Sequence, residues 1–129
     1  MSANIDTVTD FIATWNARDF DAMMGFFDDA SFYHNLPMDP VTGTDAIRKV
    51  LEMFFNSASE IDWVVHAIAE TPDGIVLTER TDRFLINGTW LDLRVMGAFD
   101  LDGRTIRKWR DYFDLKTFEA DMARVTAAG

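Results

Sequence analysis

Two alternating segments on either side of Asn87-Gly88 constrain the fold of this chain most. Residues 75–86 and 89–101 alternate apolar and polar side chains, which is the period of a β-strand with one buried face. Asn-Gly is the strongest short signal for a two-residue hairpin turn, because both positions tolerate a positive φ. Such a turn pairs Ile86 with Thr89 and sets the register of both strands along their length.

The same period recurs before and after this hairpin. Residues 60–67 alternate and are followed by the turn signal Pro72-Asp73-Gly74. Residues 104–114 alternate again after Asp102-Gly103, a second turn signal. Together these segments predict four strands joined by hairpins.

The remaining segments predict helices and one early strand. Apolar residues recur at helical spacing in residues 4–17, 19–28 and 44–54, and again from residue 116 onward. Residues 30–36 read as a short strand. This order predicts an α+β fold: a strongly curved, mixed but mostly antiparallel sheet of about five to six strands, with three to four helices enclosing a deep apolar pocket.

Composition excludes several classes of protein. The 129 residues are 48% hydrophobic, which fits a single domain over residues 1–129 with a substantial core. A net charge of -10 argues against nucleic acid, and the lack of cysteine excludes disulfides and thiolate chemistry. With no signal segment and no apolar run near the ~20 residues of a membrane helix, we expect a cytoplasmic protein without a membrane partner.

Three charged residues occupy the apolar phase of their strands. Arg80 and Asp82 alternate in step with Thr78 and Phe84, and Asp111 alternates in step with its aromatic neighbours. Burying three charges stabilises a fold poorly, so a purely structural salt bridge is the weaker reading. We interpret the three residues as a functional site.

These charges meet only if the last hairpin has an unusual register. The Asn87-Gly88 turn places Arg80 opposite Val95. A three-residue loop at Asp102-Gly103-Arg104, or an equivalent bulge, then places Asp111 opposite Val95 as well. A two-residue turn at Asp102-Gly103 would turn Asp111 to the other face of the sheet.

Four motifs carry a resemblance to a known family. They are Tyr33-His34-Asn35, Thr78-Glu79-Arg80-Thr81-Asp82, Val95-Met96-Gly97-Ala98-Phe99 and Trp109-Arg110-Asp111-Tyr112-Phe113-Asp114-Leu115. With the order of helices and strands, they resemble the limonene-1,2-epoxide hydrolase family. The resemblance implies the cone fold of the SnoaL-like and NTF2-like superfamily and a homodimer.

The resemblance also implies roles for five residues. Asp111 would be the general base on a water held with Tyr33 and Asn35, Asp82 the general acid, and Arg80 the bridge between the carboxylates. The reaction implied is one-step hydrolysis of a small apolar epoxide, of the cyclic terpene or cycloalkene type, to a vicinal diol. No cofactor or metal is implied.

Further residues are expected to line the substrate pocket or to face other surfaces. The expected lining residues are Leu36, Met38, Leu93, Val95, Trp109, Phe113 and Phe118. His34 and His66 lack the spacing of a metal site and are expected to be structural. Arg94 and Met96, beside Trp90, suit a dimer contact.

Two other functions compete with epoxide hydrolysis. A ketosteroid-isomerase-like or polyketide-cyclase-like enzyme would share the fold, but it needs no arginine between two carboxylates. A non-catalytic binder of apolar ligands would need none of the three charges.

Overall fold

A six-stranded sheet and four helices make up the computed structural model, which describes residues 2–127. The helices are α1 (Ala3–Asn16), α2 (Phe20–Met24), α3 (Thr44–Ser57) and α4 (Leu115–Ala127). The strands are β1 (Phe32–Leu36), β2 (Val41–Thr42), β3 (Glu60–Glu70), β4 (Val76–Ile86), β5 (Thr89–Asp102) and β6 (Thr105–Tyr112).

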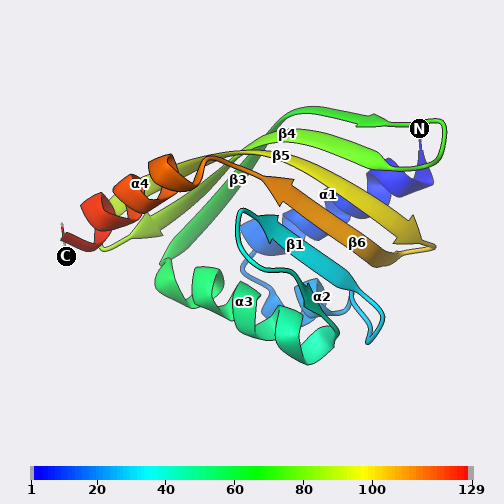
Figure 1. Cartoon of the computed structure of the whole chain (residues 1–129), viewed down its shortest axis with the longest axis horizontal. Coiled ribbons are helices and arrows are strands. Elements are labelled where there is room, and N and C mark those ends of the chain that lie inside the picture. Colours follow the sequence, from blue (N-terminus) through cyan, green and yellow to red (C-terminus); the bar gives the residue numbers. More distant parts are fainter. Residues whose placement is uncertain (1, 128–129) are drawn as a thin grey trace.

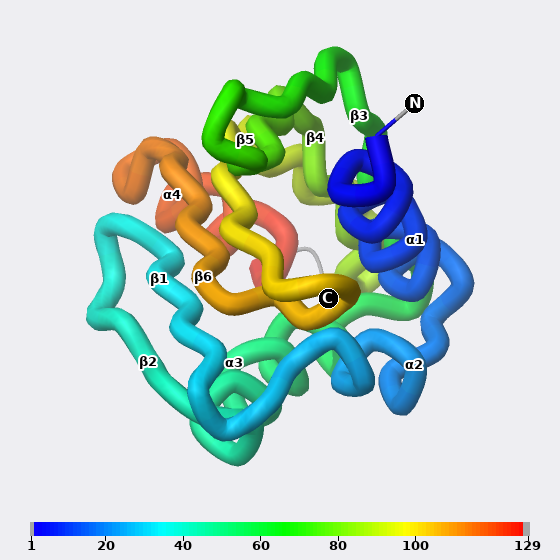
Figure 2. The backbone as a smooth tube through the Cα atoms, turned by 90° about the vertical axis from the view of Figure 1, so that its right-hand side faces the viewer, coloured from blue at the N-terminus to red at the C-terminus, as the bar shows by residue number. Residues whose placement is uncertain are grey.

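The sheet is mixed and curved, as the sequence predicts. Its strand order is β2-β1-β6-β5-β4-β3, and only β1 and β6 run parallel. Seen end-on, the strands occupy the top and left of the molecule while α1, α2 and α3 occupy the right and bottom (Figure 2). The sheet is not closed on itself, and the helices cover its concave face (Figures 1 and 2).

The central hairpin forms in the predicted register. Ile86 pairs with Thr89, and Arg80 consequently pairs with Val95. Asn87 and Gly88 have φ values of 51° and 76°, the left-handed conformation that the tight turn requires. Local turn chemistry therefore decides the pairing of the strand that carries Arg80.

The hairpin between β5 and β6 has no three-residue loop, but it contains a bulge, which is the alternative that the sequence predicts. Asp102 pairs with Thr105, so the turn consists of Gly103 and Arg104, and the register shifts by one residue between Asp100 and Leu101. This turn and the bulge together place Asp111 opposite Gly97, so the expected pairing with Val95 is wrong. The inward phase of Asp111 survives because the shift between the two pairings is two residues, the period of the strand.

One local expectation is wrong. The second helix ends at Met24 instead of continuing to residue 28, because the following chain turns to β6, where the Ile106 amide donates to the Phe26 carbonyl at 2.8 Å. The third helix begins at Thr44, as the sequence predicts, and continues to Ser57. The strand β2 is additional to the predicted strands, because its two residues are too few to show a period.

The core joins α1 to the middle of the sheet. Phe11 of α1 packs edge-on against Trp109 of β6 and Phe99 of β5, with ring centroids 5.1 and 6.1 Å apart. Trp15 of α1 stacks on Trp63 of β3 at 4.5 Å. These contacts pack α1 against the concave face of β3, β5 and β6, the face that also carries the buried charges.

Candidate active site

Arg80 is the centre of the buried polar cluster, with 1% of its surface exposed. Its Nε and Nη2 donate to the two oxygens of Asp82 at 3.0 and 2.9 Å. Nη2 and Nη1 also donate to Asp111 Oδ2 and Oδ1 at 2.9 and 3.3 Å, and Nη1 donates to Thr78 Oγ1 at 2.9 Å. All five N–H groups of the guanidinium are therefore occupied, and its position is fully determined.

Gly97 makes room for this arrangement. A Cβ atom at position 97 would lie 2.5 Å from Arg80 Nη1, 2.5 Å from Asp111 Oδ1 and 3.1 Å from Thr78 Oγ1. The guanidinium crosses the backbone of β5 at the one position that has no side chain. Arg80 thus spans from β4 to Asp111 on β6, two strands away.

The parallel pairing of β1 with β6 brings in two more residues. Tyr33 pairs with Trp109 and Asn35 pairs with Asp111, so all four side chains share the concave face. The rings of Tyr33 and Trp109 stack with centroids 4.2 Å apart. The structure therefore brings together all five residues that the family resemblance singles out.

Trp109 has a contact that the sequence reasoning missed. Its indole Nε1 donates a 2.7 Å hydrogen bond to Asp111 Oδ1. The sequence analysis predicts only a pocket-lining role for Trp109. Its spacing of two from Asp111 on the same strand was the available signal, because such residues share a face.

Burial controls the protonation of the acidic groups. Burial raises the pKa of Asp82 to about 6, although the charge and hydrogen bonds of Arg80 oppose the shift. Burial, followed by the charge of Asp111, raises the pKa of Tyr33 well above its usual value, so its hydroxyl stays a proton donor. Asp111 and Asp82 outweigh the effect of burial and raise the pKa of Arg80, which stays charged.

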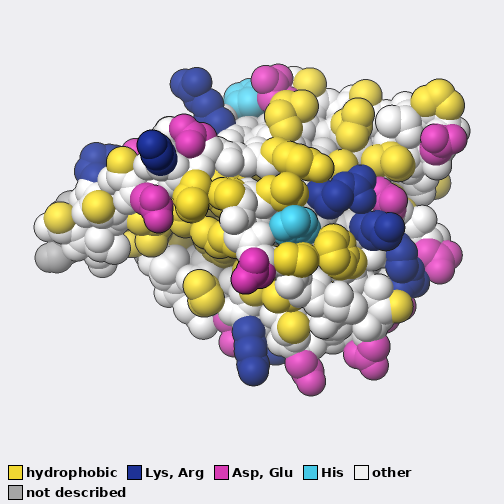
Figure 3. All heavy atoms as spheres, in the orientation of Figure 1, with side chains coloured by type: hydrophobic (Ala, Val, Ile, Leu, Met, Phe, Trp, Pro, Cys, Tyr) yellow, Lys and Arg dark blue, Asp and Glu magenta, His cyan; other side chains and the backbone are white. Residues whose placement is uncertain are grey.

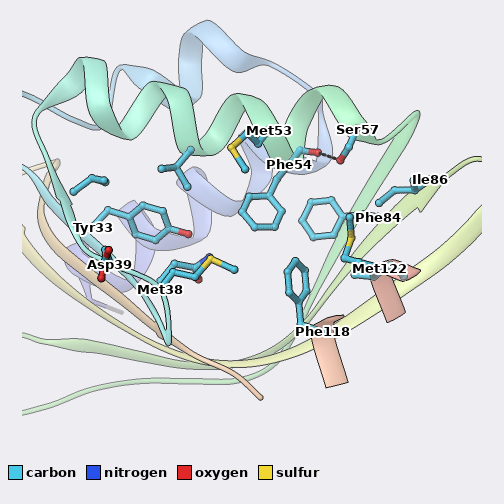
Figure 4. A pocket seen from close by; sticks show the side chains of 14 residues that line it. Tyr33, Met38, Asp39, Met53, Phe54, Ser57, Phe84, Ile86, Phe118 and Met122 are labelled. Carbon is cyan, nitrogen blue, oxygen red and sulfur yellow. Dashed lines mark hydrogen bonds between the residues drawn. The ribbon is translucent and has the colours of Figure 1, made fainter. Parts of the chain in front are cut away.

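Two cavities meet at the site. The outer cavity has a volume of about 310 Å³ and an almost entirely apolar lining that includes Met53, Phe54, Phe84, Phe118 and Met122 (Figure 4). The inner cavity is about 20 Å³, close to the space of one water molecule. Its lining includes Tyr33, Asn35, Asp82 and Asp111.

The predicted lining residues fall into three groups. Met38 and Phe118 line the outer cavity, and Leu93 and Trp109 line the inner one. Leu36, Val95 and Phe113 line neither of these two cavities, which corrects our expectation. Leu36 alternates out of phase with Tyr33 and Asn35, Val95 is packed in the core, and Phe113 lies beyond β6 against Phe118.

The histidines lie outside the site. A ring nitrogen of His34 is 2.9 Å from the Met38 carbonyl, and one of His66 is 2.8 Å from Thr81 Oγ1. Within residues 2–127, no group of three or more His, Asp or Glu side chains is placed to hold a metal ion. None of the helices in residues 2–127 has the length and hydropathy of a membrane span.

The geometry suits paired acid–base chemistry on a single water. Two buried carboxylates share one arginine, and only Asp111 also carries the Trp109 hydrogen bond. Different surroundings give two carboxyl groups different protonation states, which allows one to accept a proton while the other donates. Both carboxylates line a cavity of one water volume, which adjoins the apolar outer cavity.

Comparisons with known proteins identify a family and two epoxide hydrolases to which the chain is similar. Residues 2–124 match the model of the limonene-1,2-epoxide hydrolase catalytic domain. The chain is 30% identical over 106 residues to epoxide hydrolase EphG of Mycobacterium tuberculosis, covering 81% of this chain and 69% of that protein. It superposes on the structure of an M. tuberculosis LEH-like epoxide hydrolase with a TM-score of 0.80 and 27% identity, covering 98% and 93% of the two chains.

A more distant structure shares the fold alone. A SnoaL-like protein from Shewanella putrefaciens CN-32 superposes with a TM-score of 0.83 at 15% identity, covering 96% of this chain and 98% of that one. The cone architecture is thus common to proteins with little sequence in common.

Proposed function

The chain belongs to the limonene-1,2-epoxide hydrolase family and is an epoxide hydrolase, and from this premise we propose that Asp111, Asp82, Arg80, Tyr33 and Asn35 carry out its reaction. The observation that supports these roles best is the Arg80 guanidinium, which contacts both carboxylates while a water-sized cavity lies beside them. The reaction adds one water to the epoxide and yields a vicinal diol in one step.

Asp111 acts as the general base in this proposal. Its neighbours on β1, Tyr33 and Asn35, line the same inner cavity. No hydrogen bond joins either of their side-chain polar groups to another residue of the described chain, so both can hold the attacking water. Trp109 and Arg80 fix the orientation of the Asp111 carboxylate.

Asp82 acts as the general acid. Its raised pKa, about 6, makes it a carboxyl that holds a proton far better than an exposed aspartate does. It donates this proton to the epoxide oxygen as the carbon–oxygen bond breaks. The water oxygen attacks that carbon at the same time and passes its proton to Asp111, so the charges in the site balance.

The outer cavity supports a small apolar substrate. Its lining contains several aromatic and methionine side chains and a single charged residue, Asp39, which lies on the exposed loop between β1 and β2 (Figure 4). A volume of about 310 Å³ suits a cyclic terpene or cycloalkene oxide. The substrate is held by shape and apolar contact, and its polar oxygen is directed to Asp82.

Hydrolysis in labelled water tests the proposal. We expect the wild-type protein to convert limonene oxide and cyclohexene oxide to diols that carry one ¹⁸O atom from the solvent. Asp111→Asn and Asp82→Asn should abolish turnover, while Asp62→Asn should not, because Asp62 pairs with Arg83 on the outer face of the sheet and lines neither cavity. Turnover in either site variant, or ¹⁸O found in the protein after one cycle, contradicts the proposed roles. Exchange of protons on a ketone without ring opening would favour an isomerase instead.

We also propose that the convex face of the sheet forms a homodimer contact. Apolar side chains gather over the strands on the face seen in Figure 3, and Val64, Leu77, Met96 and Tyr112 are each at least 37% exposed. Arg94 lies among them on the same face. Light scattering should give the mass of a dimer for the wild type and of a monomer for Met96→Glu; a monomeric wild type contradicts the contact.

A further inference from the structure

The two cavities of the site share four lining residues, and one of them comes from a helix. Tyr33, Asn35, Phe54 and Phe84 line both the outer and the inner cavity. Asp82 and Asp111 line only the inner one. The apolar space that suits a substrate is therefore separated from both carboxylates by the side chains at this boundary.

Phe54 is the boundary residue contributed from the helical side. It extends from α3 into the middle of the cavity, between Tyr33 and Phe84 (Figure 4). Its ring centroid is 5.8 Å from that of Phe84 and 6.1 Å from that of Phe118. Phe54 is only half-buried, whereas Phe84 is 3% exposed and belongs to the sheet.

The inner space limits what can pass this boundary. A volume of about 20 Å³ accommodates the attacking water and no additional alkyl group. The epoxide ring must therefore lie at the boundary, with all of its substituents in the outer cavity. An epoxide with substituents on both faces of its ring has to direct one of them toward the inner walls.

We propose that Phe54 partitions the site and selects epoxides whose substituents lie on one face of the three-membered ring. This inference rests on the proposed hydrolysis and adds to it a substrate class: cis-disubstituted and ring-fused epoxides in preference to trans-disubstituted ones. The selection follows from the position of one aromatic side chain relative to both cavities.

The cis and trans isomers of β-methylstyrene oxide provide the test. They have the same atoms, so apolar transfer contributes nearly equally to the binding of both. We expect wild-type kcat/KM, corrected for the uncatalysed rates, to favour the cis isomer by about tenfold or more, the discrimination typical of one misplaced methyl group. Phe54→Leu, which removes the ring but keeps an apolar side chain, should reduce this preference by about tenfold through a gain on the trans isomer.

Phe118→Leu is the matched control, because Phe118 contacts Phe54 but lines only the outer cavity. We expect it to change KM for both isomers alike and to leave the isomer ratio near the wild-type value. A crystal structure of Phe54→Leu should show one continuous cavity that extends to Asp82.

Cyclohexene oxide turnover is measured in parallel to separate two kinds of failure. Turnover of cyclohexene oxide without a cis preference overturns the partition alone. An isomer ratio unchanged in Phe54→Leu, or changed equally in Phe118→Leu, also overturns it. Absence of turnover on all three epoxides overturns the proposed function and this inference together.

Discussion

Gly97→Ala adds a single methyl group at the place where the Arg80 side chain crosses β5. The new Cβ would lie 2.5 Å from both Arg80 Nη1 and Asp111 Oδ1. Since unstrained contacts are about 3.5 Å, one or both groups must move by about 1 Å. Neither is the free end of a flexible side chain, because each is held by several hydrogen bonds.

The expected cost has two parts. Overpacking in a closed core costs about 1–3 kcal/mol. The Nη1–Asp111 hydrogen bond, already 3.3 Å long, is the first to be lost, at about 1.5–3 kcal/mol for a charged pair. We expect Gly97→Ala to lower the free energy of unfolding in urea by about 2.5–6 kcal/mol in total. A displacement of about 1 Å at the base should also lower kcat by about 100-fold.

A double-mutant cycle tests the physical reason directly. In an Arg80→Ala background the contact with Nη1 is gone, and Asp111, without its two hydrogen bonds from the guanidinium, can move away from the methyl group. Gly97→Ala should therefore cost less than about 1 kcal/mol there, and the coupling between positions 80 and 97 should be about 1.5 kcal/mol or more. Equal costs in the two backgrounds would refute the view that Gly97 is required by the crossing guanidinium.

Two further changes probe the surroundings of the carboxylates. Trp109→Phe removes the hydrogen bond to Asp111 but keeps an aromatic ring against Tyr33. In steady-state kinetics, kcat should therefore fall by about 10–100-fold with KM little changed. An unchanged kcat would contradict a role of this hydrogen bond in orienting the base. The pKa of Asp82 is about 6 in the folded protein, above its unfolded value of 3.8. Protonation of Asp82 therefore contributes on the order of 3 kcal/mol to the free energy of unfolding below pH 4, and this contribution is lost as the pH rises through 6. Urea unfolding at pH 4 and pH 7 should show this loss in the wild type and not in Asp82→Asn, and kcat/KM should decline above pH 6 as the acid loses its proton.

The inward-facing residues were predictable because their signal is local. The period of two along a strand places Arg80, Asp82 and Asp111 on the same face as the apolar residues of their strands, and this face is the concave one. Tyr33 and Asn35 follow from the same period on β1. Asn87-Gly88 determines its hairpin through the backbone preferences of two residues, so the pairing of Arg80 with Val95 also came from sequence.

The final register of β6 was beyond this reasoning. The observed turn at Gly103-Arg104 and the bulge between Asp100 and Leu101 together move Asp111 from Val95 to Gly97, and no local pattern marks the position of the bulge. The requirement for a glycine at 97 becomes visible only once the guanidinium of Arg80 is seen to pass over it. A bulge forms where the packing of distant elements favours it, and this packing is not encoded in the adjacent residues.

By itself, the sequence determined the α+β class, the hairpin register of β4 and β5, and the set of charges that face inward, because alternation and turn preferences act over a few neighbouring residues. Only the tertiary structure decided that β1 lies parallel to β6, which brings Asn35 beside Asp111. It alone placed Phe54 of α3 between the apolar cavity and the carboxylates. Both results depend on contacts between segments far apart in the chain, whose geometry is set by how the whole core packs.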